Sequence, residues 1–163
     1  MLYQLTDRFE VRASLSDTWE FFSRPENFLR CTPGWMGMTL RTASPVAIHQ
    51  DARIDYTMRW LGLSIPWRTR IVDWSPPRQL IYIQARGPYA FWMHQHVFTP
   101  RGAKRTEVLD RVVYKLHGGP LGDLVHAMIV KHQVLDIFRW RRAQIPRHFA
   151  KIRNLQRPEI RSI

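Results

Sequence analysis

The chain has 163 residues, of which 45% are hydrophobic and 12% aromatic, so it can bury the core of one compact domain. Its 25 Lys and Arg outnumber 13 Asp and Glu, and the net charge of +12 favours a polyanionic partner or a well-solvated basic surface. No apolar run approaches the ~20 residues of a membrane-spanning helix, and the single cysteine, Cys31, excludes an internal disulfide and a cysteine-rich zinc site.

The N-terminal part of the chain predicts one strand and two short helices. Residues 9–13 alternate between apolar and polar side chains, which is typical of a half-buried strand. No apolar signal segment precedes this strand, so we expect a cytoplasmic protein of bacterial type. Ser16 or Asp17 is suited to cap the first short helix, and Pro25 is suited to the first turn of the second.

Six later segments show the same alternation and predict six further strands. These segments are residues 38–42, 53–60, 67–74, 80–84 and 91–98, and a last one that ends at Tyr114. Turn-forming residues separate neighbouring segments, for example at residues 75–78 and 86–89. Consecutive strands joined in this way favour an antiparallel meander.

A long helix is predicted after the Gly-Gly-Pro break at residues 118–120. Its apolar stripe has spacings near 3.6 and consists of Leu121, Leu124, Val125, Met128, Leu135 and Phe138. The tail at 156–163 has little apolar content, so we expect it to fray and place the single domain at 1–155. The element order predicts an α+β fold, with a seven-stranded antiparallel sheet and two short helices packed around the long C-terminal helix.

The strand predicted at 91–98 carries an unusual combination of side chains. Because side chains alternate between the two faces of a strand, Trp92, His94, His96 and Phe98 share one face. Two aromatic rings that flank two imidazoles suit neither a plain apolar core nor a solvated surface. They are typical of the wall of an apolar cavity that contains a few titratable groups.

Estimated hairpin registers place further polar groups beside these histidines. If the turn after Phe98 pairs it with Thr106, His94 lies opposite Asp110, and the preceding hairpin places Tyr82 on the other side of His94. The residues expected near this row are Gln84, His96 and Tyr114. A His94–Asp110 pair could act as a general base, with Tyr82 or Tyr114 as the donor to an oxyanion. It could equally be a structural cross-strand pair that contacts the polar end of a ligand.

His94, His96 and Asp110 also match the composition of a two-histidine, one-carboxylate metal site. Histidines two residues apart on a strand can share a face and therefore a metal ion. The sequence offers no recognisable spacing for a third ligand. We therefore predict that the chain uses no metal and no other cofactor, and that both histidines line the cavity.

The chain resembles a known superfamily over nearly its whole length. The segments that carry the resemblance are residues 9–27, 67–78, 87–89, Trp-Met-His-Gln-His-Val-Phe at 92–98, and 110–114 followed by 119–122. They resemble the START-like or SRPBCC superfamily, and within it the polyketide cyclase/dehydrase-like branch. The resemblance implies a helix-grip fold, in which a curved seven-stranded sheet holds the long helix over an apolar cavity.

The leading hypothesis for function is that this cavity binds a hydrophobic or amphipathic small molecule, such as a lipid, a quinone or a polyketide-like compound. Besides the residues named above, the expected ligand contacts are Tyr56, Met58, Trp60, Trp67, Met128 and His132. One alternative is an aromatase/cyclase or dehydratase that uses the His94–Asp110 base. A second alternative is an interaction protein whose arginine-rich segment after residue 138 contacts an anionic membrane or RNA. No DNA contact is expected, and the sequence leaves the oligomeric state open.

Overall fold

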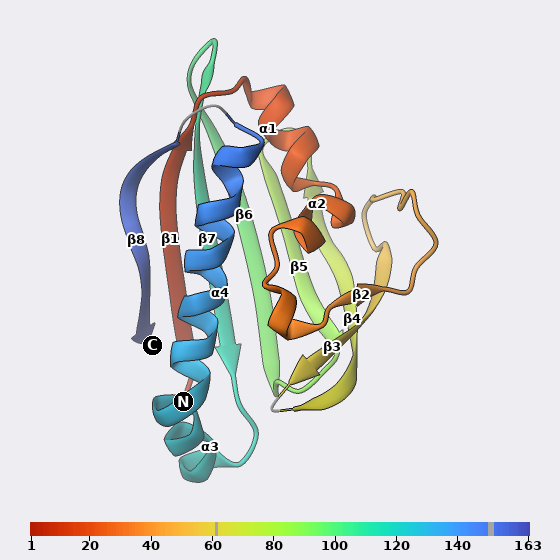
Figure 1. Ribbon diagram of the computed structural model, residues 1–163, viewed down its shortest axis with the longest axis vertical. Helices are drawn as coiled ribbons and strands as arrows, with labels where there is room; N and C mark the ends of the chain where they lie inside the picture. The colour runs from red at the N-terminus through yellow and green to blue at the C-terminus, as the bar shows by residue number, and fades with distance from the viewer. Residues whose placement is uncertain (61, 150–151) are drawn as a thin grey trace.

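The computed structural model of the protein describes residues 1–60, 62–149 and 152–163, with the side chain of Trp60 outside the described part. A single antiparallel sheet has the strand order β2-β3-β4-β5-β6-β7-β1-β8 and curves around a long helix (Figure 1). The strands are β1 (Tyr3–Val11), β2 (Thr39–Leu40), β3 (Arg53–Trp60), β4 (Leu63–Ser75), β5 (Gln79–Arg86), β6 (Phe91–Gly102), β7 (Arg105–Lys115) and β8 (Ile152–Ser162).

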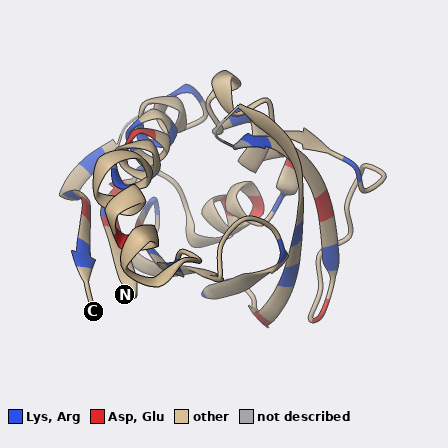
Figure 2. Ribbon diagram, turned by 90° about the horizontal axis from the view of Figure 1, so that it is seen from below, with Lys and Arg blue, Asp and Glu red and all other residues tan. Residues whose placement is uncertain are grey.

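The helices lie on the concave side of this sheet. They are α1 (Leu15–Phe22), α2 (Pro25–Arg30), α3 (Gly119–Val125), a π-helical turn η2 (His126–Val130) and α4 (Lys131–Gln144), with 3-10 turns η1 (Gly34–Met36) and η3 (Ile145–Arg147). Seen end-on, the sheet bends into a partial barrel, with α3 and α4 along one side, and Lys and Arg are spread over several elements (Figure 2). None of the described helices combines the length and the apolar character needed to cross a bilayer.

The predicted α+β helix-grip fold is confirmed, with one strand more than expected. All seven predicted strands are present, and the eighth, β8, is formed by the tail that we expected to fray. That expectation was wrong because β8 pairs antiparallel with β1, from Ile152 opposite Val11 to Ser162 opposite Tyr3. Backbone hydrogen bonds along an edge strand need few buried apolar side chains, so low apolar content did not reveal it.

The long helix buries only part of the predicted apolar stripe: Val125, Leu135 and Phe138 pack on the core, but the others are exposed. Met128 is 68% exposed and Leu121 is equally exposed, whereas Val130, Val134 and Phe138 are buried against the sheet. The cause is the π-helical turn at His126–Val130, where one extra residue per turn rotates the following segment relative to the preceding one. A continuous 3.6-residue period therefore places Leu121, Leu124 and Met128 on the wrong side of the helix.

Two groups of buried apolar side chains form the core. The larger group fills the space between α4 and strands β3 to β7, and includes Tyr56, Ile71 and Phe138. The smaller group, which includes Phe9 and Phe98, packs under α1 and the end of α4. The first group is interrupted by a cavity, which is the candidate functional site.

Candidate functional site

A cavity lies between the concave face of strands β3 to β6 and the helices α2 and α4. Its volume is about 110 Å³, measured as the space that the centre of a water molecule can reach. About 10–15 Å³ on this measure holds one water, so the cavity has room for a compact organic molecule. Of the predicted ligand contacts, the cavity wall contains Tyr56, Met58, Trp67, Tyr82, Trp92, His94 and His96.

Four other predicted contacts do not line the cavity. Gln84 closes the β5–β6 turn, since its amide donates to the Tyr89 carbonyl at 2.8 Å. Phe98 belongs to the smaller core group and contacts Trp19 edge-on. Asp110 lies behind the histidines, and the Tyr114 hydroxyl shares a hydrogen bond with His126. These four residues support the wall instead of forming it.

The two ligand contacts predicted on the long helix are corrected by the structure. Met128 and His132 are both exposed to solvent and face away from the cavity, as the π-helical turn explains. The side chain of Trp60 lies outside the described part of the chain, so its predicted contact stays a prediction.

The register around the histidines differs by two residues from the predicted one. His94 lies opposite Val112, and it is His96 that lies opposite Asp110. The β6–β7 hairpin turns later than expected and contains a register shift between Pro100 and Gly102. A two-residue shift preserves the face, so all three side chains still lie on the same side of the sheet.

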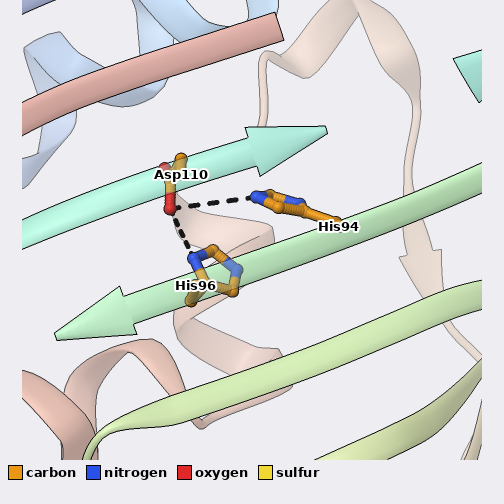
Figure 3. Close-up of side chains that lie close together, drawn as sticks. All are labelled: His94, His96 and Asp110. Carbon is orange, nitrogen blue, oxygen red and sulfur yellow. Dashed lines mark hydrogen bonds and ion pairs between the residues drawn. The ribbon is translucent and has the colours of Figure 1, made fainter. Parts of the chain in front are cut away.

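The two histidines share the Asp110 carboxylate unequally (Figure 3). His96 Nδ1 lies 2.5 Å from Asp110 Oδ1, within hydrogen-bond distance, whereas His94 Nε2 lies 3.8 Å from the same oxygen. On its other side, His94 Nδ1 shares a 2.6 Å hydrogen bond with the Tyr82 hydroxyl. Tyr82 lies opposite His94 in the strand register that the sequence predicted. His94 is therefore placed between the cavity-facing phenol and the buried carboxylate.

Burial determines the charge state of these groups. Burial, and after it the neighbouring charge of His96, lowers the pKa of His94 to about 3. Burial alone would raise the pKa of Asp110, but His96 and His94 together bring it below its usual range. Burial raises the pKa of Tyr82 above its ordinary value. At neutral pH the site therefore contains a carboxylate, a neutral His94 and an intact phenol.

This electrostatic arrangement limits the chemistry of His94. A general base is most effective when its pKa is near the operating pH. An imidazole with a pKa of about 3 accepts protons poorly at neutral pH. Its un-ionised ring and the Tyr82 hydroxyl are suited to hydrogen bonding with a bound molecule. The site thus favours ligand binding over general-base catalysis.

His94, His96 and Asp110 offer ligand atoms within 4.8 Å of one another, the composition of a two-histidine, one-carboxylate metal site. The positive charge of Arg141, which contributes to the low pKa of His94, also opposes a cation at this position. The expectation that the chain uses no metal stays a prediction.

Arg141 is the functional candidate that the sequence reasoning missed. It lies on the inner face of α4, lines the cavity and is only 5% exposed. In the sequence it was counted with the arginine-rich segment after residue 138. Its position three residues after the buried Phe138 was the signal for an inward orientation. Its neighbour Arg142 is also buried and pairs with Asp7, so two arginines of this segment are unavailable to a surface partner.

Solved structures with the same fold exist, although no protein-family model and no curated protein sequence matches the chain. The protein TTHA0849 from Thermus thermophilus is 14% identical, with a TM-score of 0.66, over 89% of this chain and 98% of that one. The Zhui aromatase/cyclase from Streptomyces sp. R1128 is 13% identical, with a TM-score of 0.64, over 91% and 96%. Norcoclaurine synthase from Thalictrum flavum, in complex with dopamine and hydroxybenzaldehyde, is 14% identical, with a TM-score of 0.60, over 93% and 90%. At these identities the similarity shows the helix-grip fold alone.

Proposed function

We propose that this protein binds a hydrophobic or amphipathic small molecule in the cavity between the sheet and α4, as a member of the START-like or SRPBCC superfamily. The observation that carries the proposal is an apolar cavity with a few polar groups on its wall, the usual composition of a small-molecule site. Met58 and Trp92 supply apolar surface, whereas Tyr82, His94 and Arg141 can orient the polar end of a ligand. Two solved structures of the same fold support it: one is an aromatase/cyclase, and the other is a norcoclaurine synthase in complex with two small molecules.

Two measurements test this proposal. Native mass spectrometry of protein purified from cells should show an apolar compound retained by the chain. Titration with the neutral fluorophore N-phenyl-1-naphthylamine should show saturable binding that the Met58→Trp variant loses, because the larger side chain fills the cavity. Met128→Trp makes the same change on the exposed face of the helix and should bind as the wild type does. Undiminished binding by folded Met58→Trp would contradict the proposal.

A second candidate is an aromatase/cyclase or dehydratase that acts on a polyketide-like compound. The observation that favours it is the 2.6 Å Tyr82–His94 hydrogen bond at the cavity wall, which fixes a phenol and an imidazole beside a bound substrate. The test is turnover of a poly-β-ketone thioester by wild type and by His94→Gln. Loss of turnover with binding retained would favour the enzyme, and binding without turnover by the wild type would favour the binding protein.

A further inference from the structure

The guanidinium of Arg141 is buried in an apolar part of the cavity wall. Its central carbon lies 4.8 Å from the ring centre of Phe28 and 4.9 Å from that of Phe138. These rings attract the cation through their faces but accept no conventional hydrogen bond. The side chain is only 5% exposed. Arg141 therefore has apolar surroundings on two sides and the cavity beside it.

Two of the three guanidinium nitrogens of Arg141 have no hydrogen-bond partner among the described residues. Nε and Nη1 are fully enclosed and have no acceptor, and no carboxylate forms an ion pair with this guanidinium among residues 1–60, 62–149 and 152–163. The buried acids Asp7 and Asp110 already have other partners, since Asp7 pairs with Arg142 and Asp110 with His96. A buried cation without hydrogen-bond acceptors is unfavourable, and an incoming acceptor would relieve this cost.

The neighbouring side chains support an acceptor at the same place. The positive charge of Arg141 acts on both Tyr82 and His94, and it lowers the pKa of each. The three groups therefore lie within electrostatic reach of one another around the cavity, Arg141 on the helix side and Tyr82 and His94 on the sheet side. Tyr82 and His94 are both uncharged at neutral pH, so neither repels an anion at the Arg141 guanidinium. Arg24, the other arginine on the cavity wall, pairs with the exposed Glu20. Among the described residues, no carboxylate lines the cavity and competes for Arg141. Asp110 is not on the cavity wall and is hydrogen-bonded to His96.

We propose that Arg141 is an anion-binding subsite, and that the cavity's ligand is a hydrophobic carboxylic acid whose carboxylate lies on the guanidinium. This inference rests on the proposed function, since it names the chemical class of the ligand. A guanidinium donates charge-assisted hydrogen bonds to a carboxylate, which are stronger than those between neutral groups. The low-polarity wall strengthens this attraction, because few waters compete for the charge. The apolar body of the acid contacts Tyr56, Met58 and Trp92.

The test compares two probes of nearly the same shape with the full chain. Naphthalene-2-carboxylate and naphthalene-2-carboxamide are titrated by calorimetry into wild type and Arg141→Met. Wild type should bind the acid at least about tenfold more tightly than the amide, as expected for a charge-assisted pair. Arg141→Met should lose this preference and still bind the amide. Arg139→Met removes an exposed arginine from the same helix and should retain the preference for the acid.

The outcomes separate this inference from the proposed function. Equal affinity of wild type for acid and amide would overturn the anion subsite and leave cavity binding intact. A preference that persists in Arg141→Met would overturn it as well. If wild type binds neither probe nor N-phenyl-1-naphthylamine, the proposed function fails together with it. If Arg141→Met does not fold, Arg141→Gln gives the same comparison. The ratio of the wild-type affinities for the acid and the amide is measured without any variant.

Discussion

His96, and not His94, is the hydrogen-bond partner of Asp110: Nδ1 of His96 lies 2.5 Å from the carboxylate, and Nε2 of His94 lies 3.8 Å away. All three side chains are almost fully buried. The arrangement separates two roles on one strand. His96 stabilises a buried negative charge, whereas His94 turns its other nitrogen to Tyr82 at the cavity wall.

Removal of the Asp110 carboxylate should destabilise the protein. Asp110→Ala leaves the N–H of buried His96 without an acceptor, and an unpaired buried donor costs about 1–3 kcal/mol, to which the new void adds. Urea unfolding of the variant and of wild type gives the difference. Asp136→Ala removes an acid from an exposed ion pair and should change the free energy of unfolding by less than about 0.5 kcal/mol. Similar effects of the two substitutions would contradict the role assigned to Asp110.

Acid should destabilise the native state partly through His94. Its pKa is about 3 in the folded protein, but near ~6.5 in an unfolded chain. Between these values the unfolded state binds a proton that the folded state does not, so stability decreases as the pH falls below ~6.5. Burial also lowers the pKa of His126, to about 4, with the same sign.

The His94→Gln variant isolates this contribution. From pH ~7 to pH ~4.5, wild type should lose on the order of 2 kcal/mol more of its unfolding free energy than the variant does. Urea unfolding at both pH values measures the two losses. Equal losses would show that His94 does not remain neutral in the folded protein.

Arg142 should prove essential to stability through its contacts with two strands. It donates to both carboxylate oxygens of the buried Asp7 in β1, and to the side chain of Asn154 in β8. Arg142→Leu leaves the Asp7 charge buried and unpaired, so we expect a loss of about 3–5 kcal/mol. Arg139→Leu, on the exposed face of the same helix, should cost less than about 1 kcal/mol. Thermal or urea unfolding of both variants measures these two losses of unfolding free energy, and similar losses would contradict the role assigned to Arg142.

Gly122 should not tolerate a side chain. A methyl group at this position would overlap the backbone carbonyl of His117 at the start of α3. Because a backbone atom cannot move aside cheaply, Gly122→Ala should destabilise the protein by about 1–3 kcal/mol. At Gly34 the same change meets no atom within 4 Å, so Gly34→Ala should be nearly neutral. The difference between the melting temperatures of these variants tests this close approach, and equal values would speak against it.

The sequence could predict the fold and the face of the cavity wall because both depend on strand alternation. Trp92, His94 and His96 face the cavity as expected, and Tyr82 lies opposite His94 because that hairpin turn was correctly estimated. The partner of Asp110 was not predictable in the same way. The segment between β6 and β7 permits more than one turn, and a register shift at Pro100 decides between them.

Two predictions for the long helix, those for Met128 and Arg141, were wrong for different physical reasons. Met128 follows the expected period but lies within the π-helical turn, which no residue pattern announced. Arg141 was assigned to a basic surface because arginine is usually solvated. Its burial depends on an aromatic neighbour from a helix far away in the sequence, since Phe28 belongs to α2.

The most direct test of the account is the structure of the protein saturated with naphthalene-2-carboxylate. The naphthalene ring should lie in the cavity against Met58 and Trp92, with its carboxylate within hydrogen-bond distance of the Arg141 guanidinium. A ring bound outside the cavity, or a carboxylate directed away from Arg141 toward solvent, would contradict it.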